Sequence, residues 1–177
     1  MTHSRAGDMI ELPPNGLVLL VGPAGSGKST WARRHVRAGA VLSSDDFRAL
    51  VADDATDQAA TADAFRALHA VARARLRRGL LTVVDATNLT ASARRALRQL
   101  AARAGRPTMA VVFDVSLERC LAQNAARSDR RVPEDVVRRH HGQLREAITA
   151  VPIEGYDEVR IIRDADLGSD EARQPMR

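Results

Sequence analysis

The sequence alternates between short, continuous apolar runs and longer segments in which apolar residues recur every three or four positions. Continuous apolar runs are typical of strands that a parallel sheet buries on both faces, and the longer spacing is typical of helices with one apolar face. The runs predict five strands, at Leu17–Val21, Ala40–Ser43, Leu80–Val84, Thr108–Phe113 and Val159–Ile162.

Helices are predicted in the segments between these strands. The clearest covers 61–78, and Gly79 directly after it fits the end of a helix. Pro133 fits the first turn of a late helix, because that position needs no backbone N–H. The other predicted helices are 28–37, a short one near Phe47, about 93–104, and 117–126.

This order of elements predicts an α/β fold, with a parallel sheet of about five strands flanked by helices. Such sheets bind their ligands at the carboxyl ends of the strands. The polar residues that follow each strand are therefore the first candidates for a functional site.

Length and composition limit the classes of protein that the chain fits. Its 177 residues suit one domain, and we expect a flexible leader over 1–15, one folded domain over 16–163 and a polar tail over 164–177. An aromatic content of 3% leaves few rings for a module that stacks bases. No apolar run approaches the roughly 20 residues of a membrane helix, and the lone Cys120 has no partner for a disulfide. We expect a cytoplasmic protein with no membrane contact.

The basic residues contain one informative exception. The chain has 27 lysine and arginine residues against 22 acidic ones, a net charge of +5, and Lys28 is the single lysine. Genomic composition can produce an excess of arginine, so the excess itself carries little weight. The lysine carries more, because the planar guanidinium of arginine does not replace a compact ammonium group.

Lys28 lies in the segment GPAGSGKS, residues 22–29, which fits the GxxxxGK[ST] pattern of a P-loop. The pattern follows a predicted strand and precedes a predicted helix, the context that a P-loop requires. Glycines let backbone N–H groups point at phosphates, and the helix N-terminus adds partial positive charge. The fold is therefore predicted to be a P-loop NTPase of the kinase type.

The P-loop predicts ATP or another NTP as phosphate donor. Lys28 is expected on the β- and γ-phosphates, and the Ser29 hydroxyl on Mg²⁺ or Mn²⁺. Thr30 contacts the nucleotide or, alternatively, caps or packs the helix. The predicted nucleotide-binding residues of this segment are Gly22, Gly25, Ser26, Gly27, Lys28, Ser29 and Thr30.

Two aspartates after the second strand are candidates for the general base that deprotonates an attacking hydroxyl. Asp45 is the better candidate because it comes first after the strand, which we expect to lie beside the P-loop. We expect one of Asp45 and Asp46 to cap the next helix instead. Arg48 lies three residues on and could hold a phosphate of the acceptor; the alternative is a solvated surface residue.

Asp85 ends the third predicted strand and is a candidate metal ligand, directly or through water. The alternative is a residue that orients Ser29 or Lys28. Thr87, two positions later, is a candidate acceptor contact.

The segment 127–133, RSDRRVP, joins two predicted helices and is rich in arginine. In P-loop kinases a mobile helical lid at this place brings arginines to the transferring phosphate, so Arg127 and Arg130 are predicted catalytic residues. The alternative is an ordinary surface turn. The pairs Arg94–Arg95 and Arg138–Arg139 are expected on solvated helix faces, and His140 is expected in packing or solvent.

Four segments occur in an order and spacing that resemble the kinase module of bacterial polynucleotide kinase–phosphatases, which heal RNA ends for repair. They are GPAGSGKST, VLSSDDFRALVADDATDQ, LTVVDATN and AARSDRRVPEDVVRRHH. The resemblance runs from about Leu17 to Ile162. The P-loop is common to many families, whereas the SSD-x-x-R element, the DD-x-x-DQ element and the strand end VVDATN are much more specific in combination.

The resemblance implies a kinase that phosphorylates the 5′-hydroxyl of RNA or DNA, using an NTP and Mg²⁺. By position, Asp45 matches the general base, Arg48 the acceptor-binding arginine and Gln58 a glutamine near the acceptor. Arg127 and Arg130 match lid arginines. The chain departs from the pattern at Gln123, where relatives can carry another arginine.

Other aspects of the resemblance stay open. Full-length relatives continue into phosphatase and ligase domains, and the sequence fits either an excised domain or a stand-alone kinase. The oligomeric state is also open. Two rival functions are a small-molecule kinase on the same fold and a nucleotide-dependent binding module without acceptor chemistry.

Overall fold

The computed structural model describes residues 10–127 and 131–171, and the side chains of 168–171 are left out of the description. It contains a five-stranded sheet in the order β2-β3-β1-β4-β5. All four pairs of neighbouring strands are parallel. The strands are β1 Leu17–Val21, β2 Val41–Ser43, β3 Thr82–Asp85, β4 Thr108–Asp114 and β5 Glu158–Arg163. The predicted α/β fold with a parallel sheet flanked by helices is confirmed.

Helices connect all the strands of this sheet. Their bounds are α1 Lys28–His35, α2 Ser44–Ala52, α3 Thr61–Arg77, α4 Ala91–Arg103, α5 Leu117–Ala126, α6 Glu134–Ala150 and α7 Asp164–Glu171, with short 3₁₀ turns at Ala38–Ala40 and Val151–Ile153. Most of these bounds lie within two residues of the prediction. Within the described residues, none of the helices combines the length and the apolar character that crossing a bilayer requires.

The helices cover both faces of the sheet. On one face, α3, α4 and the second half of α6 pack against alternate strand residues such as Leu19, Val84 and Val112. On the other face, α1, α5 and α7 pack against the intervening residues, such as Leu20 and Phe113. Because successive residues of a strand point to opposite faces, continuous apolar strands supply both cores at once.

The strand order corrects one expectation about the neighbourhood of the P-loop. β3 lies between β1 and β2, and Asp85 pairs in register with Leu20 of β1 on one side and Ser43 of β2 on the other. The strand beside the P-loop strand is therefore the one that ends in Asp85. Asp45 lies in the first turn of α2, directly after the strand beyond it, which is at the edge of the sheet.

The predicted tail contains a helix that the sequence did not reveal. Residues 164–171 form α7, and its Leu167 is buried in the core between the sheet and α1. Most of α7 is polar, so a single buried leucine left no helical period to read. Ile10 and Leu12, within the predicted leader, also pack against this core. Residues 1–9 and 172–177 lie outside the described residues.

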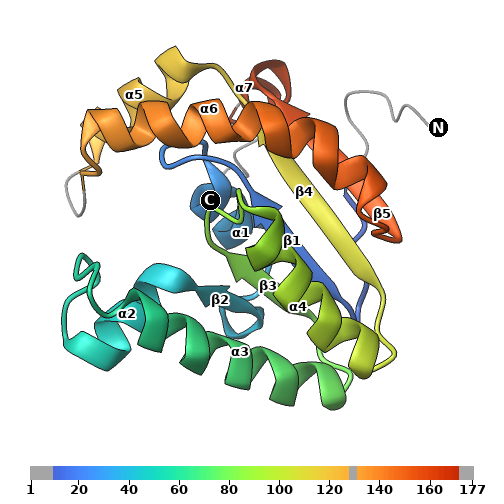
Figure 1. Ribbon diagram of the computed structural model, residues 1–177. Helices are drawn as coiled ribbons and strands as arrows, with labels where there is room; N and C mark the ends of the chain where they lie inside the picture. The colour runs from blue at the N-terminus through green and yellow to red at the C-terminus, as the bar shows by residue number, and fades with distance from the viewer. Residues whose placement is uncertain (1–9, 128–130, 172–177) are drawn as a thin grey trace, which may run out of the picture.

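Two pairs of helices stand on either side of the carboxyl ends of the strands (Figure 1). The pair α2–α3 follows β2, and the pair α5–α6 follows β4. The P-loop, between β1 and α1, lies between the two pairs. The fold thus collects the polar residues that follow β1, β2, β3 and β4 around one opening.

Candidate active site

The P-loop requires glycine at two of its positions for different reasons. Gly25 has φ +77°, and a Cβ placed on it would lie 2.2 Å from the carbonyl oxygen of Cys120. Gly27 has φ +92° and room around it, so its backbone conformation alone favours glycine. Helix α1 begins at the next residue, and its first N–H groups face the loop. This is the arrangement that binds phosphate oxygens.

Lys28 is buried within the loop that it is expected to serve. Its Nζ donates hydrogen bonds to the Pro23 carbonyl oxygen (2.6 Å) and to the Ser26 Oγ (3.1 Å). Burial lowers the pKa of Lys28 from 10.5 to about 8, opposed by the negative charge of Asp85 and assisted by the positive charge of Arg127. An anionic phosphate would supply the charge that this buried ammonium group lacks.

A cavity of about 900 Å³ opens above the P-loop, between the two helix pairs. It brings together the predicted site residues Gly25, Ser26, Gly27, Lys28, Ser29, Thr30, Asp45, Arg48, Gln58, Asp85, Thr87 and Arg127. Gly22 is not among the lining residues; its N–H donates to the Thr87 carbonyl oxygen (3.0 Å) beneath the loop. Arg130 lies outside the described residues.

Asp45 and Arg48, both on α2, form an ion pair in the wall of this cavity. The Arg48 side chain is 6% exposed, and its Nε also donates to the Ala55 carbonyl oxygen (2.9 Å). Arg48 is therefore not a solvated surface residue. Ser43 caps α2 instead of an aspartate, because its Oγ accepts from the N–H groups of Asp45 and Asp46. This corrects the expectation that one of the two aspartates caps the helix, because neither side chain has that role.

The residues near Asp85 fit a magnesium ion that accompanies a nucleotide. Asp85 is buried at the end of β3, and both it and Ser29 line the cavity. Magnesium in such sites takes one or two protein oxygens and fills its shell with phosphate oxygens and water. Among the described residues, no group of three or more His, Cys, Asp or Glu side chains is placed to hold a metal ion. A hydroxyl and one carboxylate match the magnesium mode.

Thr87 and Gln58 also line the cavity. Gln58 is exposed, and its Nε2 donates to the Thr56 carbonyl oxygen (3.2 Å). Thr30 is exposed too; its Oγ1 accepts from Arg33 (3.2 Å), and the helix has no side-chain cap. Thr30 therefore does not have the capping role that was its alternative.

Gln123 joins the P-loop to α5. With its amide oriented to satisfy both neighbours, Nε2 donates to the Gly25 carbonyl oxygen (2.7 Å) and Oε1 accepts from the Arg119 guanidinium. Arg119 also lies 3.9 Å from Asp164 of α7 and lines the cavity. Sequence reasoning missed Arg119, because its position on α5 shows in the pattern only as one arginine among many.

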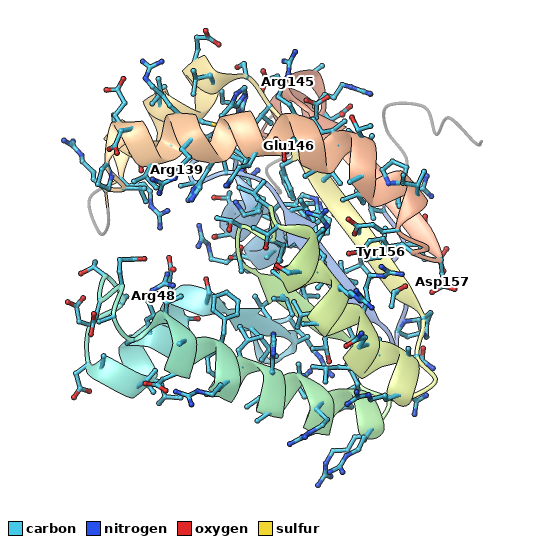
Figure 2. The ribbon with its side chains drawn as sticks, viewed as in Figure 1. Arg48, Arg139, Arg145, Glu146, Tyr156 and Asp157 are labelled. Carbon is cyan, nitrogen blue, oxygen red and sulfur yellow. The ribbon has the colours of Figure 1, made fainter. Side chains whose placement is uncertain are left out.

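Helix α6 also contributes cavity residues that were expected to be solvated or simply packed. Arg139 and His140 both line the cavity, and Arg139 lies across it from Arg48 (Figure 2). Burial lowers the pKa of His140, and the positive charges of Arg139 and Lys28 act in the same direction. His140 is therefore within electrostatic range of the phosphate-binding lysine.

The charge of the cavity wall is strongly one-sided. Among the described residues that line it, the carboxylates are Asp45 and Asp85. The arginines are Arg33, Arg34, Arg48, Arg119, Arg127, Arg131 and Arg139. An excess of cations in a cleft attracts polyanions and raises their local concentration.

Several solved structures share this fold. A chain of the Pnkp1/Rnl/Hen1 RNA repair complex is 23% identical with a TM-score of 0.66, over 83% of this chain and 49% of that chain. The APS kinase CysC of Mycobacterium tuberculosis, in complex with AMPPNP and APS, is 24% identical with a TM-score of 0.54, over 90% of this chain and 96% of that one. A sugar kinase from Janibacter is 19% identical with a TM-score of 0.56, over 92% and 88%.

These likenesses establish the fold and not a substrate. This chain spans about half the length of the RNA repair protein that it resembles. No curated protein matches the sequence significantly. The AAA domain family matches residues 17–151, which include the P-loop, both helix pairs and every described residue that the sequence predicted for the site. On the strength of that match the chain belongs to the AAA domain family, within the P-loop kinase fold.

Proposed function

We propose that this protein transfers the γ-phosphate of ATP, or of another NTP, to the 5′-hydroxyl end of RNA or DNA. The kinase-type fold supports phosphotransfer in general. The observation that favours a polynucleotide acceptor is the ion pair of Asp45 with the buried Arg48, in the wall of the same arginine-rich cavity that the P-loop lines. It offers a base for a hydroxyl and a cation for a phosphate within one helical turn.

The donor end of the reaction falls to the P-loop. Backbone N–H groups, Lys28 and Arg127 would hold the β- and γ-phosphates, with Arg130 as a further proposed lid residue. Ser29 and Asp85 would hold Mg²⁺ or Mn²⁺, which when bound neutralises charge on the phosphates. These residues position the γ-phosphorus and stabilise the charge on its equatorial oxygens.

The acceptor end falls to α2 and the residues around it. Asp45 would take the proton of the 5′-hydroxyl as its oxygen attacks the γ-phosphorus in line. The bond from that phosphorus to the β,γ-bridging oxygen breaks, and the nucleoside diphosphate leaves. Arg48 would hold the phosphate on the 3′ side of the first nucleotide, with Gln58 and Thr87 as further contacts.

The test is transfer of a labelled γ-phosphate to 5′-hydroxyl RNA and DNA oligonucleotides. We expect transfer by the native protein and none by Lys28→Ala, with both proteins melting cooperatively. Nucleoside 3′-monophosphates should be far better acceptors than nucleosides, because they carry the phosphate for Arg48. Equal use of nucleosides and oligonucleotides would contradict the proposal. Activity of this kind would place the protein in end healing, beside phosphatase and ligase activities.

The second candidate is a small-molecule kinase. Its support is that the APS kinase and the sugar kinase each match nearly the whole of both chains. A panel of sugars, nucleosides and adenylyl sulfate in the same labelled assay separates the two candidates. If no acceptor is phosphorylated while ATP binds, the protein is a nucleotide-dependent binding module.

A further inference from the structure

Arg94 is the largest side chain that the described fold buries almost completely, at 1% exposure. It lies in the first half of α4 and forms an ion pair with Glu154, which follows α6. It does not line the cavity. Burying a guanidinium costs free energy that an ion pair seldom recovers in full. An apolar side chain of the same size would fill this space without that free-energy cost. The hydrogen bonds of Arg94 show what the guanidinium does here.

The guanidinium of Arg94 also donates hydrogen bonds to a loop. Arg94 Nη1 donates to the carbonyl oxygens of Asn88 (2.9 Å) and Leu89 (2.7 Å), which belong to the connection between β3 and α4. Asn88 has φ +46°, in the left-handed region, which is uncommon for residues other than glycine and which asparagine enters more readily than most. Arg94 thus binds the carbonyl oxygens of a tight turn.

That loop is bonded in turn to the phosphate-binding segment. The Thr87 carbonyl oxygen accepts from the Gly22 N–H (3.0 Å), and Asn88 Nδ2 donates to the Leu20 carbonyl oxygen (2.8 Å). The first bond reaches Gly22, the first residue of the P-loop, and the second reaches Leu20, near the end of β1. Thr87 also lines the cavity. One loop is therefore bonded to the P-loop through its backbone and forms part of the cavity wall.

We propose that Arg94 is a positioning residue: held at one end by Glu154, it fixes the loop over 86–89 and so sets Thr87 and Gly22 in register across the active site. The inference rests on the proposed function only for the identity of the acceptor. A loss of register of about 1 Å between reacting groups can lower the rate about 100-fold. Arg94 therefore acts on the reaction through the loop and not by contact with substrate.

The test compares three variants with the native protein. In Arg94→Met with Glu154→Gln both charges are removed, so no unpaired carboxylate is left behind. Arg94→Lys keeps a cation that can reach one of the two carbonyl oxygens. Arg98→Met is the matched control, since Arg98 lies one turn further along α4 and donates to the Gly155 carbonyl oxygen (3.3 Å).

Two readouts separate positioning from general stability. The first is amide hydrogen exchange by NMR: the double variant should exchange Gly22 at least tenfold faster, with amides of β4 unchanged. The second is kcat, which should fall about 10- to 100-fold in the double variant, partly recover in Arg94→Lys and stay native in Arg98→Met. Equal acceleration of Gly22 and β4 amides, or a native exchange rate and native kcat, overturns the proposal.

The exchange measurement also keeps this test independent of the proposed function. If the native protein phosphorylates no polynucleotide, that function is wrong, while exchange at Gly22 still decides whether Arg94 holds the loop. If the double variant does not fold, Arg94→Lys decides: intermediate exchange at Gly22 with native β4 amides supports the role, and native exchange at both overturns it.

Discussion

The pKa of Lys28 predicts how nucleotide affinity depends on pH. In the free protein burial holds that pKa at about 8, and bound phosphates would raise it, because they favour the charged form. Affinity for ATP should then be full below pH 8 and fall as the pH rises above 8, by up to about tenfold per pH unit until the pKa of the complex is reached. Calorimetric titration with a non-hydrolysable ATP analogue from pH 7.5 to 9.5 measures this.

Other groups near the lysine should not interfere in that window. Burial raises the pKa of the Cys120 thiol to about 11, and the pKa of His140 lies below its usual value of 6.5. Lys28→Ala is the control: its affinity should be weaker and flat between pH 7.5 and 9.5. A native affinity that is equally flat would mean that the ammonium group does not meet the phosphates.

Asp45 should act in the chemical step and not in nucleotide binding. Asp45→Asn keeps the size and removes the charge, so transfer should fall about 10²- to 10⁴-fold, the usual contribution of a general base. Affinity for ATP with Mg²⁺ should change little. Transfer rate and nucleotide affinity, each titrated over Mg²⁺, are the measurements.

Two other aspartates serve as comparisons for that variant. Asp46→Asn, in the same first turn of α2 but exposed, should keep the native rate. Asp85→Asn should also weaken the dependence on Mg²⁺, because Asp85 lies on the metal side. Loss of ATP binding by Asp45→Asn would mean that the roles of Asp45 and Asp85 are reversed.

At the residue scale the sequence predicts what local spacing specifies and misses what tertiary packing decides. The P-loop, Asp45 and Asp85 follow strand ends, so their places in the cavity could be predicted. Arg94 could not, because an arginine on a helix is usually solvated and only the fold shows Glu154 opposite it. Arg139 was missed for the same reason, since no pattern says which face of α6 meets the cavity.

At the scale of elements, α6 offers a matched pair of arginines. Arg139 lines the cavity, whereas its neighbour Arg138 is paired with Glu134 on an exposed face. Arg139→Ala should raise the KM for an oligonucleotide acceptor about 5- to 30-fold, because a charge-assisted contact contributes roughly 1–2 kcal/mol. Arg138→Ala should leave it unchanged. Steady-state kinetics with both variants test this, and an equal effect of the two would contradict a specific role for α6.

The sequence predicted the elements well where an apolar period was present. Helix α5 begins and ends at the predicted residues, since Leu117, Cys120 and Leu121 mark its buried face. Helix α7 was missed because, among its residues whose side chains are described, it buries Leu167 alone. The order of the strands was also beyond the sequence, since nothing local says that β3 inserts between β1 and β2.

At the scale of the whole molecule, the arginines of the cavity and a net charge of +5 should make binding of nucleic acid depend on salt. Each phosphate that the protein neutralises releases counterions, so affinity falls with added salt in proportion to the number of contacts. The KM for a 5′-hydroxyl oligonucleotide should therefore rise more steeply with KCl than the KM for a nucleoside 3′-monophosphate. Parallel kinetics from 50 to 300 mM KCl compare the two; equal slopes would place one phosphate contact in the site.

The ion pair between Asp45 and Arg48 has a consequence for ATP hydrolysis in the absence of an acceptor. In the absence of acceptor, Asp45 stays ion-paired with Arg48. A water molecule in the acceptor position therefore meets a carboxylate that is a weaker base because of the neighbouring positive charge. On the proposed function, an acceptor phosphate that draws Arg48 away would make the Asp45 carboxylate a stronger base at the moment the hydroxyl arrives. Release of inorganic phosphate from ATP alone should accordingly be slow, and Arg48→Gln should raise it relative to transfer. The ion pair would thus limit ATP hydrolysis while no acceptor is bound.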